Sequence, residues 1–218
     1  MPSEPGAHMR VQLQAASPVH LSRLLPAFPL TITATRRRVL VRQRGFERVV
    51  TPGHPLVIAP FETFDMCVDG GPIQPATCNL ELQLQSASTA GMSLHHRLSR
   101  RVFVQPQQAW SAASIADLLR ASPAQVRRTL FSEGAALTEL CRTQRLMRVL
   151  FEVLADGAGP AQLRQRTGWS PRNDLEAAFY DWFGQSLHAV GRLGTGSAAN
   201  ATPRAPLFAP LWPEHQLP

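Results

Sequence analysis

The chain has 218 residues, of which 44% are hydrophobic and 17% charged, and its formal net charge is +7. This composition supports a packed core and excludes a wholly disordered protein. No run of about 18 apolar residues is present that would form a transmembrane helix. All 22 basic residues are arginine, and such an excess favours an anionic partner, most often nucleic acid.

The cysteine content and the first residues of the sequence indicate in which cellular compartment the protein is expected. Cys67, Cys78 and Cys141 form no C-x-x-C pair, and so sparse and odd a set argues against a disulfide scaffold or structural zinc. The beginning of the chain shows no basic segment followed by an apolar block, which is the pattern of a secretory signal. We therefore predict a cytoplasmic protein.

Residues 1–25 are dotted with proline and serine and have no clear hydrophobic period, which predicts a loosely ordered N-terminus. Residues 26–105 are predicted to form a small all-β unit, a sandwich or half barrel, because short apolar runs alternate with Gly/Pro turns. The segments that indicate strands are Val39–Val41, Val49–Val50, Leu56–Ile58, the alternating Cys78–Leu84 and, as a last strand, Val102–Val104.

The positive charge is densest within this β-rich region. Residues 1–109 hold 11 arginines against 6 acidic residues, whereas residues 110–192 hold 10 against 8. The densest cluster consists of Arg36, Arg37, Arg38, Arg42, Arg44 and Arg48. We interpret it as a charged edge strand that opposes aggregation, with contact to the DNA backbone as the alternative.

His54, His95 and His96 are the residues that would suggest a metal site. Neighbours in a strand point to opposite faces, so His95 and His96 could not hold one ion together there, and we predict no metal and no cofactor. The chain also lacks a phosphate-binding Gly loop, a G-x-S-x-G motif and an H-E-x-x-H motif. We therefore predict that it is not an enzyme and assign no catalytic residue.

After Trp110 the hydrophobic period becomes helical, and residues 106–192 are predicted to be all-α. An apolar stripe at i, i+3, i+4, i+7 and i+8 marks one long helix through Leu146, Val149, Leu150, Val153 and Leu154. Residues 193–218 are rich in proline and are predicted to be a disordered tail. The expected fold class is thus α+β, with an all-β domain followed by an all-α domain.

A helix-turn-helix pattern occurs at residues 114–134. Ser114 suits the N-cap of a first helix, and Ser122 with Pro123 starts a second. Val126 and Leu130 would face the core, which leaves four side chains outward: Ala124, Gln125, Arg127 and Arg128. Such a helix fits a major groove, where arginine pairs with guanine and glutamine with adenine.

A second copy of the pattern covers residues 161–184. Gly168 supplies its turn, and Ser170 with Pro171 is expected to start its second helix. The two helix starts, at Ser122 and Ser170, are 48 residues apart in the sequence. The long apolar-striped helix lies between the two copies and is long enough to separate two reading helices by about one DNA turn, on the order of 34 Å.

Residues 110–192 resemble the AraC/XylS family of bacterial transcription regulators. The ordered set that carries the resemblance is Ile115-Ala116, Ser122 before Val126-Arg127-Arg128, Glu133-Gly134, Arg145, Gly168-Trp169-Ser170, and Phe179 with Phe183-Gly184. The family implies two helix-turn-helix subdomains that read adjacent major-groove segments. By position, it implies base contacts from Ala124, Arg127 and Arg128 in the first subdomain and from Arg172, Asn173 and Asp174 in the second.

Two further features qualify this resemblance. Negative charge at Asp174, Glu176 and Asp181 in the second copy opposes phosphate, so we expect the first copy to be the stronger reader. The segment 46–60, with a glycine turn before Leu-Val-Ile-Ala-Pro, resembles more loosely the cupin-like sensor domain of such regulators. That likeness implies control by a small-molecule effector or a protein co-regulator.

The sequence therefore predicts a sequence-specific, DNA-binding transcription regulator. Its expected partners are double-stranded DNA and RNA polymerase, with a homodimer as the candidate assembly and no membrane association. One alternative is a protein-interaction adaptor that has lost or weakened DNA binding and is controlled through a protein partner. Another is a metal-dependent cupin enzyme fused to a helical domain.

Overall fold

Eight strands and seven helices make up the computed structural model, which describes residues 8–84 and 91–194. The strands are β1 (His8–Ala15), β2 (Val19–Leu24), β3 (Leu30–Arg36), β4 (Val39–Gln43), β5 (Phe46–Val50), β6 (Leu56–Ile58), β7 (Phe64–Val68) and β8 (Ala76–Gln83). The helices are α1 (Leu94–Val104), α2 (Ala112–Leu119), α3 (Pro123–Ser132), α4 (Leu137–Asp156), α5 (Pro160–Thr167), α6 (Leu175–Phe183) and α7 (Leu187–Gly191). The predicted α+β class, with a β-rich N-terminal part and a helical C-terminal part, is confirmed.

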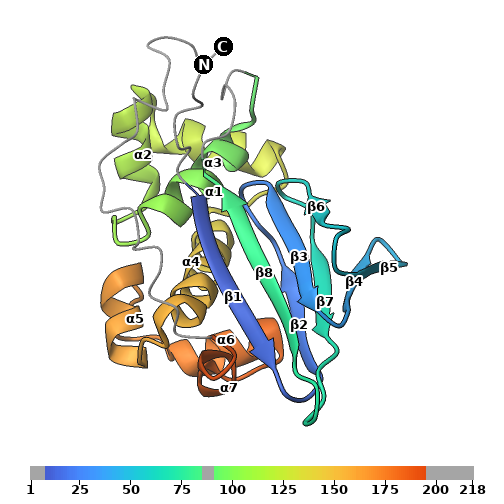
Figure 1. Cartoon of the computed structure of the whole chain (residues 1–218). Helices are drawn as coiled ribbons and strands as arrows, with labels where there is room; N and C mark the ends of the chain where they lie inside the picture. Colours follow the sequence, from blue (N-terminus) through green and yellow to red (C-terminus); the bar gives the residue numbers. More distant parts are fainter. Residues whose placement is uncertain (1–7, 85–90, 195–218) are drawn as a thin grey trace, which may run out of the picture.

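The strands form two four-stranded antiparallel sheets that pack against each other as a sandwich (Figure 1). One sheet has the order β1-β8-β3-β6 and the other β2-β7-β4-β5. The predicted alternation in β8 is confirmed, since Cys78, Leu80 and Leu82 are buried between more exposed neighbours. The helices lie on one side of the sandwich, and α4 runs along β1 (Figure 1).

The N-terminal segment differs from the prediction of a loose chain, because residues 8–24 form β1 and β2. β1 pairs with β8 along its whole length, from His8 opposite Gln83 to Ala15 opposite Ala76. Its side chains alternate between buried and exposed, as in a half-buried strand. The polar turn at Ser17-Pro18 ends this pattern early, so the strand was not predicted from the sequence. Residues 1–7 lie outside the described residues.

The predicted last strand at Val102–Val104 is wrong, because these residues end helix α1. Leu94, Leu98 and Val102 are buried at a spacing of four, which is the helical period that the prediction missed. His95 and His96 therefore occupy the first turn of a helix, with ring centroids 4.0 Å apart, and the His96 ring stacks on Phe61 at 3.7 Å. Burial, followed by the nearby His95, lowers the pKa of His96.

The prediction of a charged edge strand holds for Arg48, which lies on the edge strand β5, but not for Arg36 and Arg42, which lie on the inner strands β3 and β4. Much of the charge of the arginine cluster is matched by nearby carboxylates: Arg38 pairs with Asp69 at 2.9 Å, Arg42 with Glu47 at 3.3 Å and Arg44 with Glu62 at 2.6 Å. The cluster is therefore a partly neutralised surface rather than an open cationic patch.

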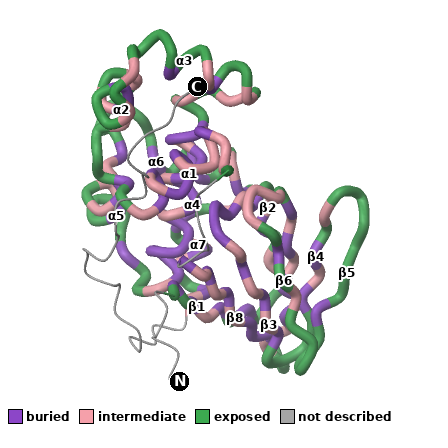
Figure 2. The backbone as a smooth tube through the Cα atoms, turned by 90° about the horizontal axis from the view of Figure 1, so that it is seen from above, coloured by how far each residue is buried: buried purple, intermediate pink, exposed green. Residues whose placement is uncertain are grey.

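Two hydrophobic cores organise the molecule. The larger core joins the sandwich interior to the second half of α4 and to buried side chains of α5, α6 and α7, including Leu163, Phe179 and Leu187. The smaller core joins α1, α2, α3 and the beginning of α4, with Leu98, Ile115 and Val126 among its members. The sandwich and the C-terminal helices thus share one interior, while α2 and α3 have another. Figure 2 shows α3 as mostly exposed and α4 as mostly buried.

The end of the described chain also joins the sandwich. Gly194 forms an antiparallel bridge with Leu13 of β1, and the backbone N–H of Gln14 donates to Leu193 O at 2.8 Å. Leu193 and Gly194 are therefore ordered, contrary to the prediction for the tail, whose remaining residues 195–218 lie outside the described residues. No helix within residues 8–84 and 91–194 is long and apolar enough to cross a membrane.

Candidate nucleic-acid interface

Helices α2 and α3, called here the first unit, are joined by a tight turn. Ser111 is the N-cap of α2 and exchanges hydrogen bonds with Ser114, which is therefore the third residue of the helix rather than its predicted cap. Arg120 ends α2 in the left-handed region, with φ 50°. Ser122 is the N-cap of α3 and Pro123 its first residue, as the sequence predicts.

The faces of α3 are separated as the helical period predicts. Val126 and Leu130 are buried against α2, and Ala124, Arg127 and Arg128 are exposed. Gln125 is also exposed, but its side-chain Oε1 accepts a hydrogen bond from the Ser122 backbone N–H at 2.8 Å. This contact closes a capping box, so the structure gives Gln125 a local role in starting the helix.

The outward arginines of the first unit are free to bind an external anion. Within the described ranges, the side chains of Arg120, Arg127 and Arg128 make no hydrogen bond and no ion pair. The arginines of the β-rich cluster differ in this respect, because several of them already pair with carboxylates. The first unit thus presents three arginines without a partner among the described residues, although the sequence places more net charge in the β-rich half.

Helix α1 shares the smaller core with the first unit and was not predicted from the sequence. The Glu133 carboxylate, at the end of α3, accepts hydrogen bonds from the backbone N–H groups of Leu94 at 2.8 Å and His95 at 2.7 Å. A carboxylate at a helix N-terminus is favourable because the unsatisfied N–H groups carry partial positive charge there. Arg100 of α1 also donates a hydrogen bond from Nε to Ala27 O at 3.1 Å, which links α1 to the sandwich.

Helices α5 and α6, called here the second unit, depart from the predicted motif. The predicted helix start at Ser170-Pro171 is wrong, because α6 begins at Leu175 with Asp174 as its N-cap. The Asp174 carboxylate accepts from the N–H groups of Glu176 and Ala177 at 2.9 and 3.2 Å. Trp169, buried before this turn, donates from Nε1 to Asn173 O at 3.2 Å and holds the longer connection in place.

The predicted readers of the second unit are consequently not side chains of a helix face. Arg172 and Asn173 are exposed in the turn before α6, and Asp174 is occupied as a cap. The exposed face of α6 itself carries Glu176, Ala177, Tyr180 and Asp181. That face offers two carboxylates and no basic group, so it is unsuited to a phosphate-lined groove.

The C-terminal end of α6 is fixed to the sandwich. Arg23 of β2 donates from Nε to Trp182 O at 2.9 Å and also to Asp181 O, while Trp182 Nε1 donates to Arg23 O at 3.1 Å. The Arg23 guanidinium lies 5.0 Å from the centre of the Trp182 ring. Cationic groups are favourable at a helix C-terminus, where the last carbonyls lack partners.

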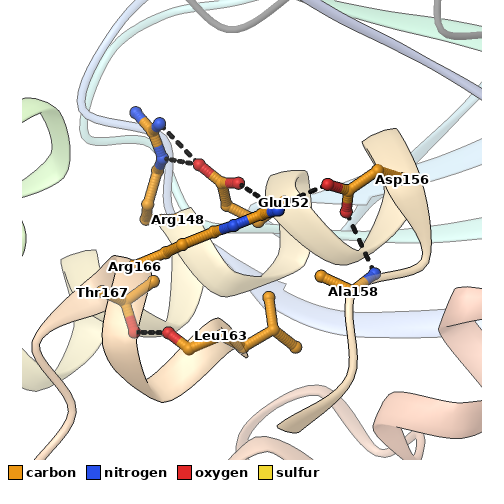
Figure 3. A network of polar contacts seen from close by, with 7 residues as sticks. All are labelled: Arg148, Glu152, Asp156, Ala158, Leu163, Arg166 and Thr167. Carbon is orange, nitrogen blue, oxygen red and sulfur yellow. Dashed lines mark hydrogen bonds and ion pairs between the residues drawn. The ribbon is translucent and has the colours of Figure 1, made fainter. Parts of the chain in front are cut away.

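A buried polar network fixes α5 to α4 (Figure 3). Glu152 of α4 is almost fully buried, and its carboxylate pairs with Arg148 at 2.6 Å and with Arg166 of α5 at 3.2 Å. Arg166 also pairs with Asp156 at 2.6 Å, and its hydrogen bond with Asp156 raises the pKa of Arg166. The second unit is therefore held at both of its helices, α5 through this network and α6 through Arg23.

A groove of about 650 Å³ lies between the two units. Ser111 contributes from the first unit, Ser170 and Asn173 from the second, and Arg142 and Arg145 from α4. Arg145 also donates to Pro106 O at 3.0 Å and Gln108 O at 3.1 Å, which positions the segment before α2. None of the described residues that line the groove is acidic, so its charge suits an anion.

The described residues contain no group of three His, Cys, Asp or Glu side chains that could hold a metal ion. Cys141 is buried where the two units meet α4, and this burial raises the pKa of its thiol to about 11. A thiol of that kind is neutral and serves as a small apolar group in the core.

No family model matches the sequence, and no curated protein matches it either. The whole architecture has counterparts among solved structures. ToxT from Vibrio cholerae strain SCE256, solved with an unsaturated fatty acid bound, aligns with a TM-score of 0.62 and 8% identity over 91% of this chain and 99% of the other. The chain has the fold of ToxT.

A second ToxT structure, the 1.65 Å structure in a P21 crystal form, aligns with a TM-score of 0.64 and 8% identity. That alignment covers 87% of this chain and 100% of ToxT, so both the sandwich and the helices take part in it. This likeness supports the predicted order of a β-rich N-terminal part and a helical C-terminal part. At this identity the agreement is one of fold.

Proposed function

We propose that the protein is a sequence-specific, DNA-binding transcription regulator whose main reader is α3. The observation that carries this proposal is the exposed pair Arg127 and Arg128, unpaired with any described residue, on a helix that is capped and backed by its own core. Arginine forms two parallel hydrogen bonds with guanine O6 and N7, and α3 has the size of a helix that enters a major groove.

We assign the second unit to positioning rather than to base reading. Its helices are fixed to α4 and the sandwich, and its exposed helix face is acidic. Arg172 would contact the DNA backbone from the turn before α6, together with Asn173. The groove between the units would take the sugar-phosphate chain between them, since its lining includes Arg142 and Arg145 and, among the described residues, no carboxylate.

The sandwich is proposed as the regulatory, cupin-like part. Because ToxT has been solved with an unsaturated fatty acid bound, a fatty acid is the first effector class that we propose to test. A protein co-regulator is the other class, and contact with RNA polymerase and homodimer formation belong to the same proposal. A thermal-shift titration of the full chain with a monounsaturated fatty acid would reveal binding as a rise in Tm.

The DNA-reading proposal is tested by substituting Arg127 and Arg128 singly with alanine in the full chain. Each loss of a bidentate base contact is expected to weaken binding to a selected DNA site by roughly 5- to 150-fold, which corresponds to about 1–3 kcal/mol. Binding is measured by mobility shift, and sequence preference by selection from a random DNA pool. Each variant should also relax the preference at one base position.

Arg10→Ala is the matched control, because Arg10 is an exposed arginine of β1, on the sandwich and outside both units. It should leave the affinity within about twofold, as a distant surface charge is screened by salt. Unchanged affinity and unchanged sequence preference in both Arg127→Ala and Arg128→Ala would refute α3 as the reader.

The acidic face of α6 favours a second candidate function, a protein-interaction adaptor without DNA binding. Glu176, Tyr180 and Asp181 together offer a polar surface with one aromatic ring, as many protein interfaces do. A salt titration separates the two functions. A DNA-binding regulator loses affinity steeply between about 50 and 200 mM salt, whereas an adaptor binds no DNA even at the lower concentration.

A further inference from the structure

Phe131 is an unexpected residue on the outer face of the first unit. It lies in the last turn of α3, and 84% of its surface is exposed. The neighbouring apolar residues of this helix, Val126 and Leu130, are both buried in the smaller core. The fold therefore does not use the Phe131 ring, although burying a phenylalanine side chain is among the larger favourable contributions available to a small helical unit.

The position of Phe131 on the helix connects it to the reader residues. Ala124, Arg127, Arg128 and Phe131 follow the spacing i, i+3, i+4 and i+7, so they lie along one stripe of α3. The seven residue steps from Ala124 to Phe131 span about 10.5 Å of helix axis, which is close to the major-groove width of about 12 Å. A helix laid across the groove would thus bring all four side chains toward base edges.

The charge around Phe131 indicates which partner covers it. Arg127 and Arg128 lie about one helical turn before Phe131 and have no partner in the described parts of the chain. An apolar ring beside two free cations fits an anionic surface that also exposes apolar groups. Major-groove DNA has this character, because phosphates border it and the thymine methyl group lies on its floor.

We propose that Phe131 is a specificity-determining residue that selects thymine by contact with its 5-methyl group, next to the bases contacted by Arg127 and Arg128. The thymine methyl is the apolar feature of the major-groove edges, and phenylalanine is one of the side chains that contact it. This inference rests on the proposed function and extends it from guanine recognition to a second base.

The test combines a protein substitution with a DNA substitution. Full-length wild type and Phe131→Ala are measured on a selected site and on the same site with one thymine at a time replaced by deoxyuridine, which lacks the methyl group. At one thymine, wild type should lose about fourfold in affinity, on the scale of one buried methyl group. Phe131→Ala should bind the two DNAs equally, and Phe131→Leu should retain part of the discrimination.

Phe46→Ala is the matched control, since Phe46 is another exposed phenylalanine, at 74%, and lies on the edge strand β5. It should discriminate thymine from deoxyuridine as wild type does. Equal weakening of Phe131→Ala on both DNAs would overturn the proposal in favour of sequence-independent contact with sugar or phosphate. Unchanged DNA binding with loss of promoter activation would overturn it in favour of a protein partner.

The outcome also separates this inference from the proposed function. If Arg127→Ala and Arg128→Ala weaken binding while Phe131→Ala keeps the wild-type preference for thymine, the regulator proposal stands and the Phe131 proposal fails. If wild type binds no DNA at low salt, both proposals fail.

Discussion

At the residue scale, the structure changes the role predicted for Gln125 from base reading to helix capping. Outward glutamines of recognition helices read adenine, and the sequence predicts that role here. In the structure the carboxamide oxygen is already bonded to the Ser122 N–H, and the Gln125 N–H in turn donates to Ser122 Oγ at 3.2 Å. A side chain committed to a capping box fixes the beginning of α3 and thereby the direction of its arginines.

Gln125→Ala is therefore expected to act through stability. Loss of one half of a capping box should lower the free energy of unfolding by about 0.5–2 kcal/mol. DNA affinity should fall by a similar factor on every sequence, because no base contact is lost. Urea denaturation measures the first effect and selection from a random DNA pool the second. A specific loss of preference for adenine would instead show that Gln125 reads a base.

At the element scale, α4 connects the two cores and carries the buried Glu152 network. Removing Glu152 leaves Arg148 beside the Phe103 ring, at 5.7 Å, without its carboxylate, in a place where water has little access. An uncompensated buried charge is costly, so Glu152→Ala should lower the free energy of unfolding by about 3–5 kcal/mol. Urea denaturation monitored by tryptophan fluorescence is the measurement.

Glu139→Ala is the control for this prediction. Glu139 lies on the same helix, its side chain is 60% exposed, and its pair with Arg142 spans 4.0 Å. A surface pair of this kind contributes roughly 0.5 kcal/mol or less, so the control should unfold almost as wild type does. Similar effects of the two substitutions would mean that the Glu152 network does not hold α5 on α4.

The length of an uninterrupted hydrophobic period decides which elements could be predicted from the sequence. β8 and α4 have long, uninterrupted periods, and both are found at the expected positions. β1 lies next to a turn with polar residues, and the apolar residues of α1 are separated by arginines and histidines, so neither period was recognised. The start of α6 was misplaced because Ser-Pro is a frequent helix start, whereas the N-cap in the structure is Asp174, four residues after Ser170 and an equally favoured cap residue.

The candidate site was predictable only in part, for a related reason. The helical period was sufficient to turn Ala124, Arg127 and Arg128 outward. The same period turns Phe131 outward, and Ser122-x-x-Gln125 is a local capping-box signature, so both could have been predicted. The attachment of α6 to Arg23 depends on contacts between residues far apart in the sequence. Such contacts leave no periodic signal in a single sequence.

At the scale of the whole molecule, the shared core means that the helical half is not a separable domain. Leu150, Phe179 and Leu187 of the helical half lie in the same interior as the sandwich residues. A fragment of residues 106–194 would therefore expose a large apolar surface, and we expect it to aggregate or to lack fixed tertiary structure. Near-UV circular dichroism and dye binding to exposed apolar surface would detect this state.

The full chain is the control for the fragment. A fragment that unfolds cooperatively and binds the selected DNA site as tightly as the full chain would contradict the shared core. The first unit is affected as well, since the fragment lacks α1, which supplies Leu94, Leu98 and Val102 to the core of α2 and α3.

The bridge between Leu13 and Gly194 has a consequence for the order in which the protein is made. The two residues are 181 positions apart, so a contact near the beginning of the chain waits for a residue near its end. Helix α4 lies on the same strand, β1, and is also synthesised long after it. During synthesis the outer edge of β1 therefore lacks its contact with Leu193 and Gly194 until translation has passed Gly194, which leaves a strand edge open to other chains in the meantime.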